Sequence, residues 1–205
     1  MSSTETPQTV AEFWFGPDAG NADDAAVAER QAALWWRKNP ETDNAIRRRF
    51  EDVITEAAMG ALDTWAQVPA GRLALILLTD QFSRNIYRDT KAAFGHDLLA
   101  LAWCKEGLKR GDDERLRPIE RVFFYLPLEH SESRQDQERS VTLYRALSAG
   151  VPPSQRAVFD GFLDFALRHR DIVERFGRFP HRNRLLGRAS SPQELAFLEE
   201  PGSSF

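Results

Sequence analysis

Polar side chains that could do chemistry gather in three segments of the sequence: LLTDQFSRNIYR at 77–88, PLEHSE at 127–132 and HRDIVERFGRFPHRNRLLGR at 169–188. Arginine forks bind carboxylates and phosphates in a bidentate way. A histidine beside carboxylates can transfer protons, because its charge changes near neutral pH. The three segments therefore predict a site for a small anionic ligand, with acid and base groups available if a reaction follows.

The first segment follows the apolar run LALILL and places Asp80 and Arg84 one helical turn apart, with Asn85 next in the chain. An exposed pair at this spacing stabilises a helix by only about 0.2 to 0.5 kcal/mol. A structural ion pair and a ligand-binding role are both open for Asp80 and Arg84. In the second role Asn85 would orient the ligand.

The second segment has Glu129, His130 and Glu132 shortly after Pro127. We take His130 with Glu129 or Glu132 as the candidate acid/base pair, since a neighbouring carboxylate raises the pKa of an imidazole. Adjacent residues on a helix point in different directions, so capping of the helix end is the alternative role.

The third segment leaves a helix at Gly177, and its loop offers four polar residues: Arg178, His181, Arg182 and Asn183. Arg178 and Arg182 are the candidate anion donors, together with Arg84. The alternative is a latch, in which these arginines pair with acids such as Asp80, Glu129 and Glu132. We expect Arg182 to be uncompensated without a ligand, so that its loss leaves stability unchanged or raised. His169, on an apolar stripe, is expected to be a buried structural histidine.

No metal or cofactor is predicted for this chain. Cys104 is the only cysteine, and the four histidines show no paired ligand spacing. Glycine-rich phosphate loops are absent from the sequence as well.

The composition limits the partners that we expect. A net charge of -4 argues against general nucleic-acid binding, although seven arginines between 168 and 188 make RNA contact the third alternative. The run LALILL is far shorter than the roughly 20 residues that a membrane-spanning helix needs. The N-terminus has no basic and apolar leader pattern. We therefore expect a cytoplasmic protein whose partner is a small anionic molecule or an acidic peptide, with no membrane contact.

Apolar residues recur at three- and four-residue steps along the whole chain, which is the helical spacing. This predicts an all-α protein, a single domain over 1–205 with flexible ends at about 1–9 and 199–205. Short turns between the helices favour stacked antiparallel hairpins. The expected helices cover about 22–38, the stretch from Pro40 to about 57, 71–88, 91–109, a segment from Pro118 that kinks or stops at Pro127, 135–149, 154–176 and a short helix to Leu198.

Five motifs in order resemble one bacterial family: EFWFG at 12–16, DNAIRRRF at 43–50 and the three polar segments, the second extended to YLPLEHSE. The chain is similar to the domain of unknown function 924 family. Thr42, Thr79 and Ser83 depart from the pattern that we expect there. The resemblance implies a helical fold like that of tetratricopeptide-repeat proteins. The activity of the family is not established, so the resemblance implies no reaction.

Two functions follow from these patterns. The leading one is binding of a small anion on the concave side of the helices, where the three segments would meet. The alternative is an interaction scaffold that holds an acidic peptide. A closed pocket with convergent polar groups would favour the first, and a shallow groove with exposed Trp or Tyr the second. Whether the protein is an enzyme stays open.

Overall fold

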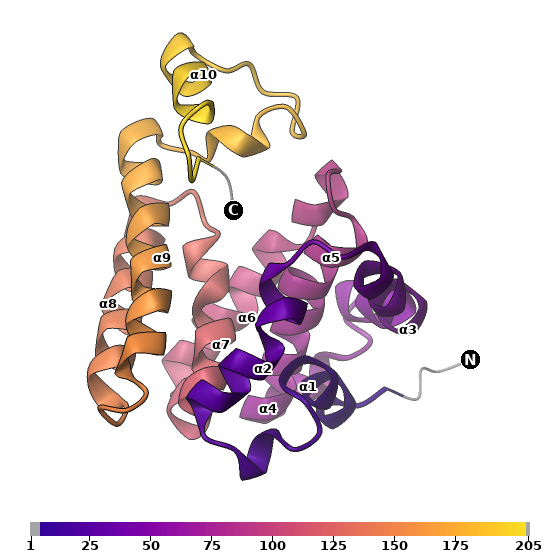
Figure 1. Cartoon of the computed structure of the whole chain (residues 1–205). Coiled ribbons are helices and arrows are strands. Elements are labelled where there is room, and N and C mark those ends of the chain that lie inside the picture. Colours follow the sequence, from indigo (N-terminus) through magenta and orange to yellow (C-terminus); the bar gives the residue numbers. More distant parts are fainter. Residues whose placement is uncertain (1–4, 204–205) are drawn as a thin grey trace.

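The computed structural model describes residues 5–203, which form helices and turns with no strand. The predicted all-α class is confirmed (Figure 1). No helix in this range is long and apolar enough to span a membrane. The α-helices are α1 (Pro7–Phe15), α2 (Asp24–Trp36), α3 (Pro40–Ala58), α4 (Pro69–Ile76), α5 (Ser83–Ile86), α6 (Asp97–Arg110), α7 (Pro118–Glu129), α8 (Arg134–Gly150), α9 (Arg156–Phe176) and α10 (Pro192–Leu198).

The central element runs from α4 into α5 through a π-helical turn, η3 (Leu77–Phe82), whose residues are all buried. The Ser83 hydroxyl donates to the carbonyl of Leu78, five residues earlier, at 3.1 Å. Helices α1, α3, α6 and α7 pack around this element. The sequence predicted one regular helix over 71–88, so the π turn is a departure. Such turns are frequent at functional sites, and this one carries Asp80.

An aromatic core joins the N-terminal helices to α7. The indole N–H of Trp35 donates to the carbonyl of Trp14 at 2.9 Å, and the ring of Trp35 lies 4.6 Å from that of Phe123. Helix α1, which we did not predict, begins at Pro7 after a capping box at Thr6. The predicted flexible ends fall partly on residues 1–4 and 204–205, outside the described residues, and residues 7–9 belong to α1.

Helix α7 continues through Pro127 and ends at Glu129. Of the two outcomes predicted at Pro127, a kink or a stop, the stop does not occur. Helices α6 and α8 both pack against α7. The Tyr144 hydroxyl of α8 also donates to the carbonyl of Val122 at 2.7 Å. As a result, Glu129 lies on the last turn of a buried helix, with His130 just after it.

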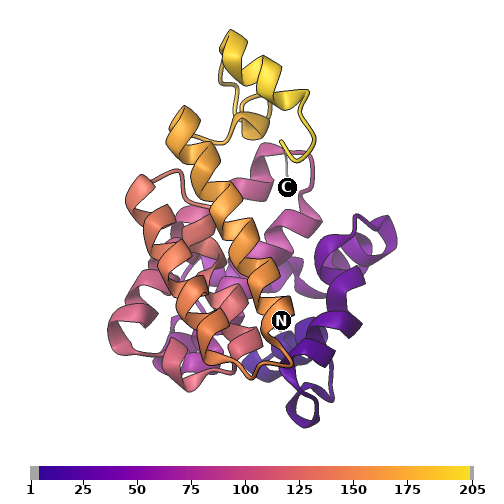
Figure 2. The same cartoon turned by 60° about the vertical axis from the view of Figure 1, so that its left-hand side comes forward.

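Helices α8 and α9 form a predicted antiparallel hairpin, which faces the viewer in Figure 2. Helix α9 ends at Gly177, which takes the left-handed φ of 71°. The chain then passes through a 3₁₀ turn, η6 (Pro180–Arg182), to α10, which a capping box at Ser191 begins. The tetratricopeptide-like array stays a prediction: α1 packs on α4 and α2 on α7, whereas stacked repeats contact only their neighbours.

Candidate functional site

The first two polar segments meet at Asp80 and His130. His130 Nδ1 lies 2.7 Å from Asp80 Oδ1, and Arg84 Nη2 lies 3.2 Å from the same oxygen. Arg84 Nε is also 3.3 Å from His130 Nδ1. Nδ1 cannot donate to Asp80 and accept from Arg84 at once. Because the contact with the Asp80 carboxylate is the shorter one, we assign the proton to Nδ1, which donates it to Asp80. The lone pair of the ring is then on Nε2.

The charges of this group follow from its surroundings. Burial would raise the pKa of Asp80, but His130, Arg84 and the Gln81 amide hold it well below its usual value. Burial and the charge of Arg84 lower the pKa of His130, and Asp80 only partly opposes them. At neutral pH Asp80 is therefore charged and His130 neutral.

The third segment reaches this group through Arg182. Asp97, the first residue of α6, lies between two guanidinium groups: its Oδ1 is 3.0 Å from Arg84 Nη2, and its Oδ2 is 3.3 Å from Arg182 Nη1. The Arg182 guanidinium lies 4.8 Å from the ring centroid of Phe94 and 4.5 Å from that of Phe179. The expectation that Arg182 is uncompensated is wrong, because Asp97 and both rings hold it.

Within residues 5–203 each of the two arginines has one nitrogen without a hydrogen bond of good geometry, although Arg84 Nη2 lies at ion-pair distance from Asp80 and Asp97. Arg84 Nη2 and Arg182 Nε are buried, and within residues 5–203 neither has an acceptor in hydrogen-bond geometry. Burial and the charge of Arg84 lower the pKa of Arg182 to about 10. Asp97 thus lies between two cations, of which Arg84 has a second carboxylate partner in Asp80. A further acceptor at the nitrogens without a hydrogen bond would stabilise this arrangement.

A second buried pair lies behind His130. Glu129 Oε1 is 3.0 Å from His169 Nδ1, which is also 2.9 Å from the carbonyl oxygen of Phe165. Burial raises the pKa of Glu129 to about 8 and lowers that of His169 well below its usual value. At neutral pH this contact therefore joins two neutral groups and is not an ion pair. His169 is buried, as predicted.

The predicted partners of His130 have other contacts. Glu129 contacts His169, and Glu132 accepts from the Phe179 N–H at 2.8 Å and from Arg188 at 2.7 and 2.9 Å. The carboxylate beside His130 is that of Asp80. Glu132 instead ties the C-terminal segment to the end of α7 through Arg188. The latch that the sequence left open was to use Arg178 and Arg182, which pair with Glu194 and Asp97.

Residues 10–202 match the family described as bacterial protein of unknown function, DUF924. The chain belongs to this family. A solved protein of unknown function from Agrobacterium tumefaciens, ATU0120, is 39% identical, with a TM-score of 0.73, and the match covers 86% of this chain and 99% of that one. No curated protein matches the sequence.

Some predicted residues of this DUF924 protein lie apart from Asp80 and His130. Asn85 donates to Asp43 of α3 at 2.9 Å, and Arg178 pairs with Glu194 of α10 at 2.6 and 2.8 Å. Asn183 donates to the Ser190 hydroxyl at 3.0 Å. These contacts connect structural elements.

His181 lies near the cluster, with its ring 5.7 Å from that of Phe179. Burial and the charge of Arg182 lower its pKa to about 3. The sequence missed Asp97 and Phe94, because an acid in the first turn of α6 looks like an ordinary helix start. No group of three or more metal-ligating side chains occurs within the described part of this DUF924 protein.

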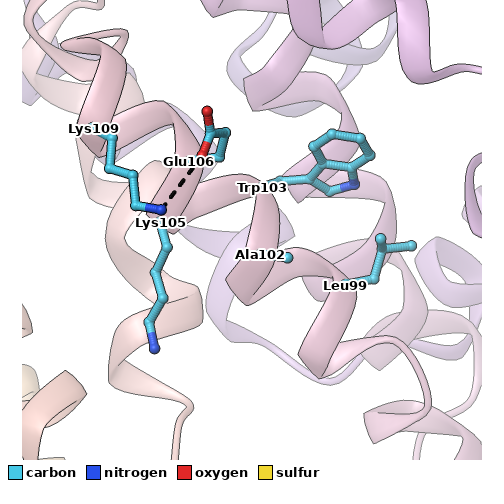
Figure 3. Close-up of a pocket in the computed structure, with 6 residues that line it drawn as sticks. All are labelled: Leu99, Ala102, Trp103, Lys105, Glu106 and Lys109. Atoms are coloured by element: carbon cyan, nitrogen blue, oxygen red, sulfur yellow. Dashed lines mark ion pairs between the residues drawn. The ribbon is translucent and has the colours of Figure 1, made fainter.

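Two surface depressions of the DUF924 protein lie elsewhere. One of about 380 Å³ follows α6 and is lined by Leu99, Ala102, Trp103, Lys105, Glu106 and Lys109 (Figure 3). The other, of about 510 Å³, is lined by Arg175, Phe176, Arg178, Ser191, Gln193 and Glu194. Neither lining includes Asp80 or His130. Because Asp97 lies between Arg84 and Arg182, a ligand that binds both guanidinium groups there must displace the Asp97 side chain.

Proposed function

We propose that the protein binds a small carboxylate or phosphate compound between Arg84 and Arg182, beside His130. The observation that carries the proposal is the Asp97 carboxylate, which lies between the guanidinium group of the buried Arg182 and that of Arg84, which also contacts Asp80. We name this place the two-arginine site. Arg178, Asn85 and Asn183 have no part in it.

The electrostatics of the surrounding residues support an anionic ligand. Burial is the main cause that lowers the pKa of His130, His169 and His181, and the charge of Arg182 contributes to each. The charge of Arg182 thus disfavours a proton on each of these rings, while Asp80 opposes this effect at His130. An anion at the site would offset the repulsion between the two arginines.

His130 is placed to act as the acid/base group if the bound molecule reacts. Asp80 fixes Nδ1 as the protonated nitrogen at 2.7 Å, which makes Nε2 the basic atom. A carboxylate that sets the tautomer of a histidine in this way is a common device of general acid–base catalysis. Glu129 and Glu132 serve as supports of the helix end and of the C-terminal latch.

We expect phosphate or small carboxylates to raise the thermal midpoint of the protein and to bind more tightly at pH 6 than at pH 8, because a bound anion favours protonated His130. Arg182→Lys removes the planar fork and should abolish the effect. Arg178→Lys, which changes an arginine outside the site, should keep it. Differential scanning fluorimetry over an anion panel measures these midpoints. If no anion raises the midpoint of the wild type, or if anions raise the midpoints of both variants equally, the two-arginine site is contradicted.

The alternative is an acidic peptide held in the α6 depression, whose lining includes Lys105, Lys109 and the indole of Trp103 (Figure 3). Charge and an apolar floor both suit such a partner. Lys109→Glu should then weaken peptide binding, while Arg182→Lys should not affect it. A cytoplasmic location and a tetratricopeptide-like stacking of the helices belong to this proposal as well.

A further inference from the structure

We infer that Asp97 is a built-in occupant of the two-arginine site, and that the carboxylate or phosphate group of the ligand takes its place. This inference rests on the proposed function and deepens it. It names a ligand whose anionic group is about the size of an aspartate side chain. It also makes the start of α6 the part of the protein that moves when the ligand binds.

The contacts of Asp97 are those of a ligand held from two sides. One carboxylate oxygen faces Arg84 at 3.0 Å and the other faces Arg182 at 3.3 Å. Oδ1 is buried and, within residues 5–203, accepts no bond of good hydrogen-bond geometry. An external anion is free to orient its oxygens along the guanidinium N–H groups, whereas Asp97 is constrained by its backbone.

Of the two acids near Arg84, Asp97 is the one that can leave. The side chain of Asp80 is 1% exposed, and that of Asp97 is 21% exposed. Asp80 also bonds His130 and Gln81. Asp97 begins its helix, and the next residue, Leu98, is 82% exposed. A shift of Asp97 at the start of α6 therefore moves a less buried side chain than a shift of Asp80 would.

The arginines would stay in position after Asp97 leaves. Arg84 keeps its contact with Asp80 at 3.2 Å and its bond to the Ala93 carbonyl at 3.3 Å. Arg182 keeps its position between the rings of Phe94 and Phe179. Such a preorganised pair of donors lowers the cost of ordering when an anion binds.

The test is chemical rescue of Asp97→Ala with formate, acetate and inorganic phosphate. We expect this variant to melt below the wild type, and these anions to restore its midpoint. At least one of them should bind ten or more times more tightly than it binds the wild type, where Asp97 competes. Asp97→Asn, which keeps the size of the side chain, gives the same comparison if the alanine variant does not fold. Asp43→Ala is the matched control. It removes a carboxylate of α3 that Arg88 and Asn85 hold, and it should gain no affinity for these anions.

The outcomes separate the two proposals. If the wild type binds anions and neither Asp97 variant binds them more tightly, the inference is overturned and the proposed function stands. If neither the wild type nor the variants bind, both fail. Tight binding by the variants with weak binding by the wild type supports Asp97 as the occupant.

Discussion

Arg84→Met will lower the free energy of unfolding by about 3 to 5 kcal/mol at pH 7, the usual cost of removing one partner from a buried ion pair. Arg84 lies within 3.2 Å of Asp80 and 3.0 Å of Asp97. Methionine fills much of its volume but leaves both acids without that cation, and burial then penalises their charge. Urea denaturation followed by circular dichroism measures the loss.

Arg168→Met is the control for this change. Arg168 pairs with Asp164 on α9, and both side chains are more than half exposed, so its loss should cost less than about 1 kcal/mol. The pKa of Asp80 is lowered in the folded protein, so its stabilising contribution is present above the ordinary aspartate pKa and is lost as the pH falls. The difference in the free energy of unfolding between Arg84→Met and the wild type should therefore become smaller below about pH 4. A wild-type-like midpoint at pH 7 would mean that Asp80 and Asp97 do not depend on Arg84.

Glu129→Gln will raise the free energy of unfolding at pH 7 by about 2 to 4 kcal/mol and change it little near pH 4. Burial raises the pKa of Glu129 from 4.5 to about 8 in the folded state. A carboxyl whose pKa is raised by folding contributes most to stability below its pKa in the unfolded state. That contribution is lost as the pH rises toward the pKa in the folded state. Glutamine keeps the shape of the protonated acid and does not titrate.

Glu132→Gln is the matched control, because it changes a nearby glutamate whose pKa is shifted in the opposite direction. Burial opposes that shift, but Arg188 and the Phe179 N–H outweigh it and lower the pKa of Glu132. Its neutral replacement should therefore lose stability at pH 7. Urea titrations of all three proteins between pH 4 and 8.5 give the profiles. Parallel profiles for the wild type and Glu129→Gln would show that Glu129 is ionised in the fold.

The sequence predicted what depends on local patterns. Helical spacing located most helices, and the glycine at 177 marked a helix end, because capping is decided within a few residues. The π turn was missed, because an insertion of one residue into a buried helix leaves the apolar pattern almost unchanged.

The pairing of charges could not be predicted in the same way. His130 has Glu129 and Glu132 beside it in the chain, yet it contacts Asp80, fifty residues earlier. Which carboxylate reaches an imidazole is decided by how α7 packs on the π turn, and that is tertiary structure. Asp97 entered the site for the same reason, since its partners come from α5 and from the loop after α9.

The most direct test of the two-arginine site is the state of His130, read from its ring nitrogens by long-range ¹H–¹⁵N NMR with and without inorganic phosphate. We expect the His130 ring to be neutral at pH 7, with its proton on Nδ1. The pKa of His130 should rise when phosphate is added to the wild type, but not when it is added to Arg182→Lys. A ring protonated on Nε2, or a pKa that phosphate moves equally in both proteins, would contradict the two-arginine site.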